Sequence, residues 1–279
     1  MAAIPFVTES RPAPGFPIPV AEGVSRILAP NRGVLTHHGT NSYVVATPDG
    51  PVVIDPGPED REHVEALLTA TGGKVAAILI THGHGDHVAA AAALKAATGA
   101  PIHASPASIA EDLAVDVPLV HGSQVHGLRP LHTPGHSPDH FSFAMGNEVV
   151  FTGDHVMTWS TTAVSPPRGS MIDYRRSLSL LLEESDWKLL LPGHGAPSRE
   201  PAALMSALMA HRLERERQVL AWVKAGAGTP PAIADRIYAG LAPERRGPAE
   251  RTVLAYLLSL AAAGLVAHDG DTWRSSSGT

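Results

Sequence analysis

Four side chains of the kind that binds metal ions fall within six residues, in the segment His82-Gly83-His84-Gly85-Asp86-His87. Residues two apart in an extended loop point the same way, so His82 and His84 can bind one ion. Asp86 and His87 come at the entrance of a predicted helix and face onward, where they can bind a second ion. Histidine is the commonest metal ligand in proteins, so the segment predicts a metal-binding site.

Three later side chains of ligand type stand in similar positions, each in a turn that follows a strand-like segment. They are His136 in Thr133–Ser137 (TPGHS), Asp154 after the apolar run Val149–Thr152, and His194 in Pro192–Gly195 (PGHG). Loops at strand ends on a rigid sheet are where α/β proteins collect functional groups. A carboxylate such as Asp154 can bridge two cations. The chain has no cysteine, so thiolate sites and disulfides are excluded.

The elements that must position these side chains alternate between strands and helices. Short apolar runs bounded by Gly, Pro or Asn predict strands at Val24–Ala29, Tyr43–Thr47, Pro51–Asp55, Val75–Ile80, Val125–Leu131, Phe141–Met145, Val149–Thr152 and Lys188–Leu191. Helical patterns occupy Glu59–Thr71, Val88–Thr98 and Tyr174–Ser185. This interleaving predicts a layered α/β domain that ends near residue 200.

The character of the chain changes after residue 200. Helical patterns cover Ala202–Lys224, Pro231–Leu241 and Pro248–Ala263, and Leu265–Trp273 predicts a β-hairpin that turns at Asp269-Gly270. Three helices and a hairpin suggest a winged-helix-like module. We therefore divide the chain into an N-terminal arm (1–20), a catalytic domain (21–204) and a C-terminal domain (205–279).

Composition limits the classes of partner. The net charge is −6, which gives no general attraction to nucleic acids or acidic membranes. The hydrophobic fraction of 44% allows a sizeable core. The first twenty residues lack a basic segment followed by an apolar run, and no apolar stretch is long enough to span a bilayer. We therefore expect a cytoplasmic protein with no membrane partner. The sequence does not indicate the oligomeric state.

The spaced box His82–His87, followed in order by His136, Asp154 and His194, resembles the metallo-β-lactamase superfamily over roughly residues 20–200. The resemblance implies a four-layer αββα sandwich with the site along one edge of its two sheets. It also implies two ions, the first held by His82, His84 and His136, the second by Asp86, His87 and His194, with Asp154 bridging them. Asp55 matches the family's structural aspartate and is expected to brace the ligand loops.

A closer resemblance is to the subgroup that includes beta-lactamase-like protein two, which joins this fold to a C-terminal winged helix. The segments Gly39–Tyr43, Thr133–His140, Phe151–Met157 and Pro201–Trp273 carry it. It implies a hydrolase with two Zn2+, in which a metal-bridging hydroxide cleaves an ester-like or phosphodiester bond. The resemblance makes single-stranded RNA the leading specific substrate. Otherwise the expected substrate is a small molecule. Fe or Mn could occupy the same ligands.

Further roles are assigned to residues near the ligand motifs. The resemblance implies that Asp86 orients the nucleophile and accepts its proton. His155 is either a proton donor or substrate contact, or a packing group, and His140 is expected to support the ligands from behind. In the Pro- and Gly-punctuated segment Val164–Arg176, residues that could bind an anionic substrate group are Arg168, Tyr174 and Arg175.

Three other functions stay open. Glyoxalase II, a thioester hydrolase, shares the metal ligands but has a different C-terminal region. A mononuclear-iron persulfide dioxygenase would use the positions of His82, His136 and Asp154 and leave the second ligand set idle. A DNA-binding regulator would act through the tail, whose nine Lys and Arg are interleaved with seven Asp and Glu. That balance opposes sequence-specific DNA binding.

Overall fold

Two β-sheets face each other in the computed structural model, which describes residues 3–108, 110 and 113–276. The first is a seven-stranded sheet whose strands follow one another in chain order. Its members are β1 (Pro17–Ala21), β2 (Val24–Leu28), β3 (Asn41–Val45), β4 (Val52–Ile54), β5 (Ala77–Leu79), β6 (Ile102–Ala104) and β7 (Val117–Pro118). The pairing is antiparallel from β1 to β4 and parallel from β4 to β7.

The second sheet has four strands in the order β11-β10-β9-β8. They span Leu128–His132 (β8), Phe141–Met145 (β9), Val149–Gly153 (β10) and Leu189–Pro192 (β11). The helix α4 (Met171–Glu184) lies in the connection between β10 and β11, which pair in parallel. A crossover of this kind needs a long connection, and the helix supplies it.

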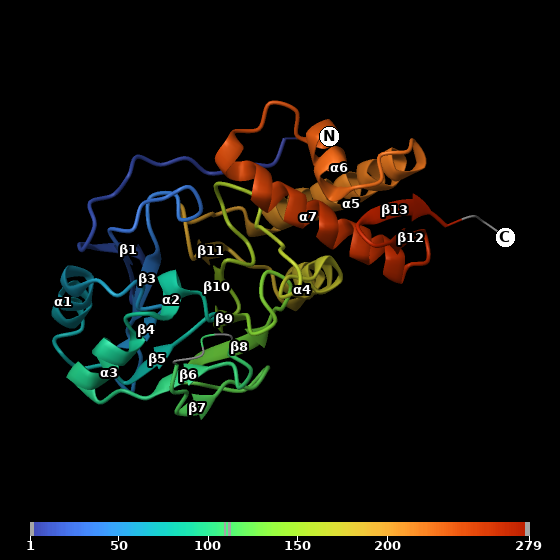
Figure 1. The fold of residues 1–279 in the computed structure, drawn as a ribbon. Coiled ribbons are helices and arrows are strands. Elements are labelled where there is room, and N and C mark those ends of the chain that lie inside the picture. The colour runs from blue at the N-terminus through green and yellow to red at the C-terminus, as the bar shows by residue number, and fades with distance from the viewer. Residues whose placement is uncertain (1–2, 109, 111–112, 277–279) are drawn as a thin grey trace.

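The side chains of the strands alternate between three apolar layers, as the two-residue period of a strand requires. In β5, Leu79 packs between the two sheets, whereas Ile78 packs against α1 (Arg61–Ala70) and α3 (Ala91–Thr98). In β10, Phe151 faces the space between the sheets and Val150 faces α4. The predicted four-layer αββα arrangement is therefore confirmed, with helices on both outer faces (Figure 1).

The C-terminal part consists of α5 (Pro201–Lys224), α6 (Pro230–Ile237), α7 (Pro243–Ala262) and the hairpin of β12 (Val266–Asp269) and β13 (Thr272–Ser275). These elements lie on the α4 side of the sandwich (Figure 1). Their core is continuous with that of α4, since Val219, Tyr256 and Trp273 belong to the same buried cluster as Leu178. In the described part of the chain, no helix has the length and apolar character needed to cross a bilayer. Because β1 and α5 run across residues 20 and 204, the domain division stays a prediction.

Several elements differ from those predicted. No pattern in the sequence predicts β6 or β7. The Pro-rich opening Arg11–Pro19 predicts an extended arm on the surface or along a sheet edge, and its end forms the edge strand β1, where two prolines are tolerated. The helix predicted over Val88–Thr98 is two helices, α2 (Gly85–Val88) and α3, because the Ala90 amide donates to the Gly57 carbonyl instead of continuing the helix. The helix α7 begins at Pro243 rather than Pro248.

Gly135 lies in the turn that carries His136. Adding a methyl group at this position should lower the free energy of unfolding. A Cβ at Gly135 would lie 2.3 Å from the backbone nitrogen of Tyr174, and its φ is +136°. Gly146 is a matched control, because its φ is also positive (+58°) but nothing lies within 4 Å. We expect Gly146→Ala to lower the free energy of unfolding by about 1 kcal/mol, and Gly135→Ala by at least about 3 kcal/mol. Urea unfolding measures both, and equal losses would contradict the close packing.

Candidate functional site

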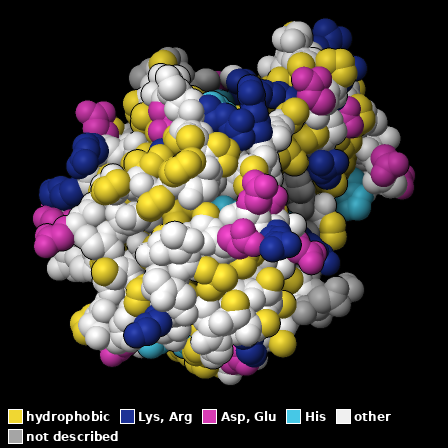
Figure 2. Space-filling model, turned by 90° about the vertical axis from the view of Figure 1, so that its left-hand side faces the viewer, with side chains coloured by type: hydrophobic (Ala, Val, Ile, Leu, Met, Phe, Trp, Pro, Cys, Tyr) yellow, Lys and Arg dark blue, Asp and Glu magenta, His cyan; other side chains and the backbone are white. Residues whose placement is uncertain are grey.

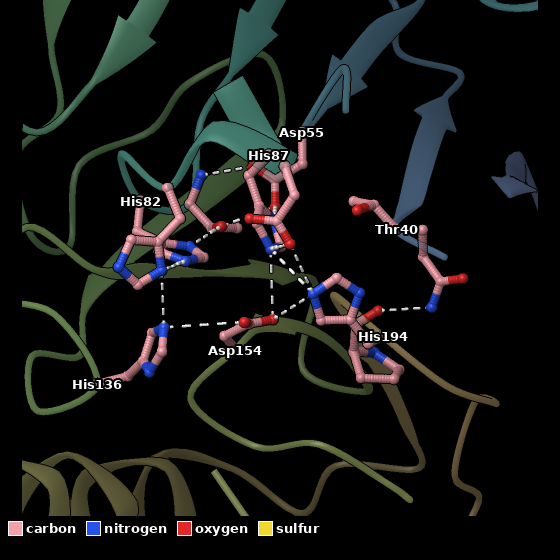
Figure 3. A network of polar contacts seen from close by, with 12 residues as sticks. Thr40, Asp55, His82, His87, His136, Asp154 and His194 are labelled. Carbon is pink, nitrogen blue, oxygen red and sulfur yellow. Dashed lines mark hydrogen bonds and ion pairs between the residues drawn. The ribbon is translucent and has the colours of Figure 1, made fainter. Parts of the chain in front are cut away.

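The ligand-type side chains predicted from the sequence converge at one edge of the sandwich. His82, His84, Asp86 and His87 follow β5, in the loop that leads into α2 and in α2 itself. The other three come from the four-stranded sheet, where His136 lies between β8 and β9, Asp154 follows β10 and His194 follows β11. The site is thus assembled from both sheets (Figure 3).

Three histidines form one group. The Nε2 of His82 lies 2.9 Å from the Nδ1 of His84, and the Nε2 of His136 lies 3.0 Å from the same Nδ1. Nitrogens this close can all reach one cation, and the three residues satisfy the geometric condition for holding one. Imidazole nitrogens suit zinc, iron and copper.

A second group contains Asp86, His87 and His194. The Nε2 of His194 lies 3.2 Å from Oδ2 of Asp86 and 3.3 Å from the Nε2 of His87. These three residues satisfy the same geometric condition. Two nitrogens and a carboxylate oxygen make a second donor set that suits a divalent cation.

Asp154 stands between the two groups, with one carboxylate oxygen facing each (Figure 3). Its Oδ1 lies 3.4 Å from the Nε2 of both His87 and His194, and its Oδ2 lies 3.8 Å from the Nε2 of His136. The side chain is buried, and Oδ1 receives no hydrogen bond from the described residues. A buried carboxylate oxygen without a donor is what a bridging cation ligand would leave behind, so the residues present fit a pair of metal ions.

The far sides of the rings are fixed by oxygen acceptors. The Nδ1 of His87 lies 2.8 Å from Oδ2 of Asp55, that of His136 lies 2.8 Å from the Ala163 carbonyl, and that of His194 lies 3.2 Å from the Gly39 carbonyl. A neutral imidazole that donates from Nδ1 keeps its lone pair on Nε2. Each ring therefore points a metal-binding nitrogen into the cluster.

Asp55 lies behind the ligands, where the resemblance puts it. Its carboxylate also accepts from the backbone amide of Thr81 (2.8 Å) and from the Thr81 hydroxyl (2.7 Å), and the side chain is buried. Three hydrogen bonds on one carboxylate tie the end of β4 to the start of the ligand loop and to α2. This explains how a loop containing two glycines can hold a defined shape.

Burial and charge divide the histidines into two electrostatic classes. Burial lowers the pKa of His82 well below its usual value and that of His84 to about 4, so both rings are neutral at pH 7. Burial opposes protonation of His194 too, but the carboxylates of Asp154 and Asp86 raise its pKa to about 9. His87 is likewise buried, yet the carboxylates around it raise its pKa well above the usual value.

Metal binding is therefore expected to release protons. The pKa of His194 is about 9 and that of His87 is raised well above its usual value, so protons on these two rings oppose metal binding, and a cation must displace them because only neutral imidazole coordinates. We expect about two protons per chain at pH 7.5 and an affinity that rises with pH up to about 9. Zinc titration by calorimetry in buffers of different ionisation enthalpy measures the number. A buffer-independent enthalpy would contradict the expectation.

A cavity of about 620 Å³ opens over the cluster. Its floor includes His84, Asp86, His136, Asp154 and His194. The walls come from three other segments, which contribute Leu35, Met157, Ala163, Ser165 to Arg168, Pro248 and Arg251. Arg168 thus lines the cavity, as its predicted substrate role requires.

Other residues predicted to act on substrate lie away from this cavity. Tyr174 is fully buried in the core below α7, and Arg175 pairs with Glu216 across a groove between α4 and α5. His155 is fully buried against the Tyr174 ring, and burial lowers its pKa to about 3. His140 is buried with its Nδ1 2.9 Å from the Thr133 hydroxyl and its ring centre 5.2 Å from that of His82. His140 therefore packs behind a ligand.

Sequence reasoning missed Arg251 and Leu35. Arg251 lies on α7, far along the chain from every ligand, and in the sequence it is one of several charges on a helix face. Leu35 is an exposed side chain in the loop before β3. No local pattern marks either residue, because their place in the wall depends on how the C-terminal helices dock.

Comparisons with known proteins agree with this architecture. The family description "Metallo-beta-lactamase superfamily" matches residues 35–117 and 112–194, and "Beta-lactamase associated winged helix domain" matches residues 229–273. The Drosophila melanogaster "Beta-lactamase-like protein 2 homolog" is 28% identical over 79% of this chain and 77% of its own length. An "Atrochrysone carboxyl ACP thioesterase" of Aspergillus chevalieri is 32% identical over 71% of this chain and 64% of its own length.

A solved structure, a beta-lactamase domain protein from Burkholderia ambifaria, superposes with a TM-score of 0.83 at 21% identity, covering 96% of this chain and 95% of that one. This likeness extends over both the sandwich and the C-terminal helices and shows the shared fold. Together with the matched residues and the convergent histidines and aspartates, it places the chain in the metallo-β-lactamase superfamily, in the branch that carries an associated winged helix domain.

Proposed function

We propose that the chain is a binuclear metal-dependent hydrolase, with two zinc ions, that cleaves an ester-like bond. The observation that carries the proposal is the position of Asp154 between two complete three-residue donor groups. Two divalent cations held there would lower the pKa of a shared water towards 7 and polarise the oxygen of the bond to be cleaved. Zinc suits four- to five-coordinate sites built from nitrogen and oxygen donors, and the same donors accept iron or manganese.

Asp86 is the residue proposed to handle the proton of the attacking water. It lines the cavity and its side chain is 30% exposed, whereas Asp154 is 11% exposed. Burial favours the neutral acid, but the nearby His87 lowers the pKa of Asp86 to about 2. The carboxylate is therefore ionised at neutral pH, where it can orient a water by accepting a hydrogen bond. His155 does not line the cavity, so we give it a packing role.

The walls of the cavity favour an acyl substrate over RNA. Single-stranded nucleic acids bind through aromatic side chains on which bases stack. The described lining of this cavity contains no Phe, Tyr or Trp, and Trp159 and Tyr238 line only the adjoining, smaller cavity. The lining of the larger cavity contains instead Leu35, Met157, Pro166 and Pro167, which suit an aliphatic chain. The thioesterase name of one relative agrees in kind with this choice, so we take a carboxylic ester or thioester as the substrate.

The competing functions predict different measurements. The protein reconstituted with zinc, iron or manganese is analysed for metal content and assayed with octanoyl-N-acetylcysteamine, an unstructured RNA oligomer, and glutathione persulfide under oxygen. We expect two ions per chain and thioester hydrolysis. One iron per chain with oxygen uptake would replace the proposal by a persulfide dioxygenase, and cleavage of RNA alone would replace the ester by a phosphodiester.

A further inference from the structure

The cavity over the ligand cluster adjoins a second one beside α7. The second cavity has a volume of about 190 Å³ and shares four wall residues with the first, namely Leu35, Met157, Ala163 and Pro248. Its remaining walls combine apolar and aromatic side chains, such as Val34, Trp159, Leu241 and Tyr238, with polar ones that include Arg212 and Arg245. The second cavity is therefore a mainly apolar recess next to the ligand cavity, covered by α7 and by the segment between α6 and α7.

Two arginines face the first cavity from opposite sides of the interdomain contact. Arg168 belongs to the loop after β10, and Arg251 belongs to α7. Their segments meet where the Nε of Arg251 lies 3.4 Å from the Ser165 hydroxyl. Both side chains are exposed, so their guanidinium groups can turn towards a ligand in the cavity.

Neither guanidinium group has an acidic partner within ion-pair distance among residues 3–108, 110 and 113–276. Two arginines nearby are paired, Arg246 with Asp235 and Arg175 with Glu216, whereas Arg245, which lines the second cavity, also has no acidic partner within ion-pair distance among the described residues. The contrast matters, because a paired arginine is already neutralised. Lys and Arg side chains gather on the upper part of the face in Figure 2, among hydrophobic side chains.

The only carboxylates in the described lining of the first cavity are Asp86 and Asp154. Both belong to the proposed ligand set, so bound cations would take up their negative charge. Arg168 and Arg251 would then face a cavity without a counter-charge. Arginine binds carboxylate and phosphate oxygens through paired hydrogen bonds, so an anionic group of a ligand is the natural complement.

We propose that Arg168 and Arg251 together form a recognition site for an anionic group, a phosphate or a carboxylate, on the thiol or alcohol part of the substrate. The aliphatic acyl chain lies in the apolar recess under α7. This proposal rests on the proposed function and names the class of substrate as an amphipathic acyl thioester or ester. Hydrolysis adds water across the C–S or C–O bond: the acyl carbon gains the hydroxyl oxygen, and the leaving sulfur or oxygen gains a proton.

The test compares three thioesters with the same acyl chain. Octanoyl-coenzyme A carries phosphates, S-octanoyl-mercaptoacetate carries a carboxylate, and octanoyl-N-acetylcysteamine is neutral. We expect KM for at least one anionic thioester to rise about tenfold in each of Arg168→Met and Arg251→Met, with kcat unchanged and the neutral thioester unaffected. The preferred anion distinguishes phosphate from carboxylate. Arg246→Met is the matched control, since it removes a paired arginine from the same helix.

A binding measurement separates recognition from turnover. Two thioethers that cannot be hydrolysed, S-octyl-coenzyme A and S-octyl-mercaptoacetate, represent the two anions. The one that matches the preferred anion is titrated by calorimetry into the metal-free and the zinc-loaded wild-type and variant proteins. We expect weaker binding in both arginine variants and a wild-type affinity that falls with added salt, because exposed charges are screened.

Different results would contradict the arginine site and the hydrolase activity. Equal kcat/KM for anionic and neutral thioesters in the wild type, or unchanged KM values in both arginine variants, would overturn the inference and leave the hydrolase intact. Failure of the zinc enzyme on all three thioesters would overturn the proposed function. Cleavage of single-stranded RNA that depends on both arginines, without thioester hydrolysis, would reassign the pair to nucleic acid.

Discussion

The Asp154→Asn protein is expected to hold at most one metal ion per chain and to lose more than about 100-fold in kcat/KM. We expect more than 100-fold because replacing a residue that only supports a metal ligand already lowers metal affinity or activity by about 10- to 100-fold. Asp154 directs one oxygen at His136 and the other at His87 and His194. An amide of the same shape keeps one oxygen but turns a non-coordinating NH2 towards the other group, so it cannot bridge.

Metal content by mass spectrometry and thioester turnover should fall together in this variant. Asp116→Asn serves as the control, because Asp116 also takes part in an ion pair, with Lys95, but lies away from the cluster. Two ions per chain with full activity in Asp154→Asn would remove the basis of the proposed mechanism.

A second large effect is expected from Asp55→Asn, which changes no ligand. Oδ2 of Asp55 accepts from the Thr81 hydroxyl and faces the Nδ1 of His87. If Oδ1 of the amide keeps the Thr81 backbone N–H, its NH2 group must occupy the other position. His87 would then have to accept at Nδ1, which places its proton on Nε2, the nitrogen that faces Asp154 and His194. The metal affinity should fall by about 10- to 100-fold.

Asp55→Asn should lower the free energy of unfolding less than Asp55→Ala does. Deleting the carboxylate leaves two buried groups without partners, the Thr81 amide and the Nδ1 of His87, whereas the Thr81 hydroxyl keeps the Nδ1 of His82 at 3.0 Å. Each unmet group costs about 1–3 kcal/mol of unfolding free energy. Asp49→Asn is the matched control, because the exposed Asp49 forms the same contact with the Nδ1 of a half-buried histidine, His126, at 3.0 Å. We expect zinc competition assays to separate the two asparagine variants clearly. Equal zinc affinities would show that Asp55 does not set the tautomer of His87.

The ligand cluster could be anticipated from sequence because its signals are local. His82 to His87 occupy one loop, and His136, Asp154 and His194 each follow a strand that its own apolar run reveals. Convergence then follows from the fold, because strand ends on the same edge of the sandwich lie close together. The buried strands β5 and β10 could also be predicted from sequence, since each packs apolar side chains on both faces and is therefore a continuous apolar run.

The cavity wall could not be anticipated, because it is made by docking between distant segments. Tyr174 and Arg175 share a segment with Arg168, yet only Arg168 lines the cavity, since α4 turns the other two into the core and the outer groove. His155 follows a ligand directly, yet the turn after β10 directs its ring inward. One-residue differences of this kind depend on side-chain direction, which composition and spacing do not report.

The floor and the roof of the cleft are encoded in separate stretches of the chain, since the candidate ligands end at His194 and the roof comes from α7 and the segment before it. Changes in the roof can therefore alter which molecules are admitted without disturbing the groups that react with them. Because of this division, sequence changes confined to the C-terminal helices can produce new substrate preferences. It also gives protein engineers a place to randomise that leaves the reactive centre whole.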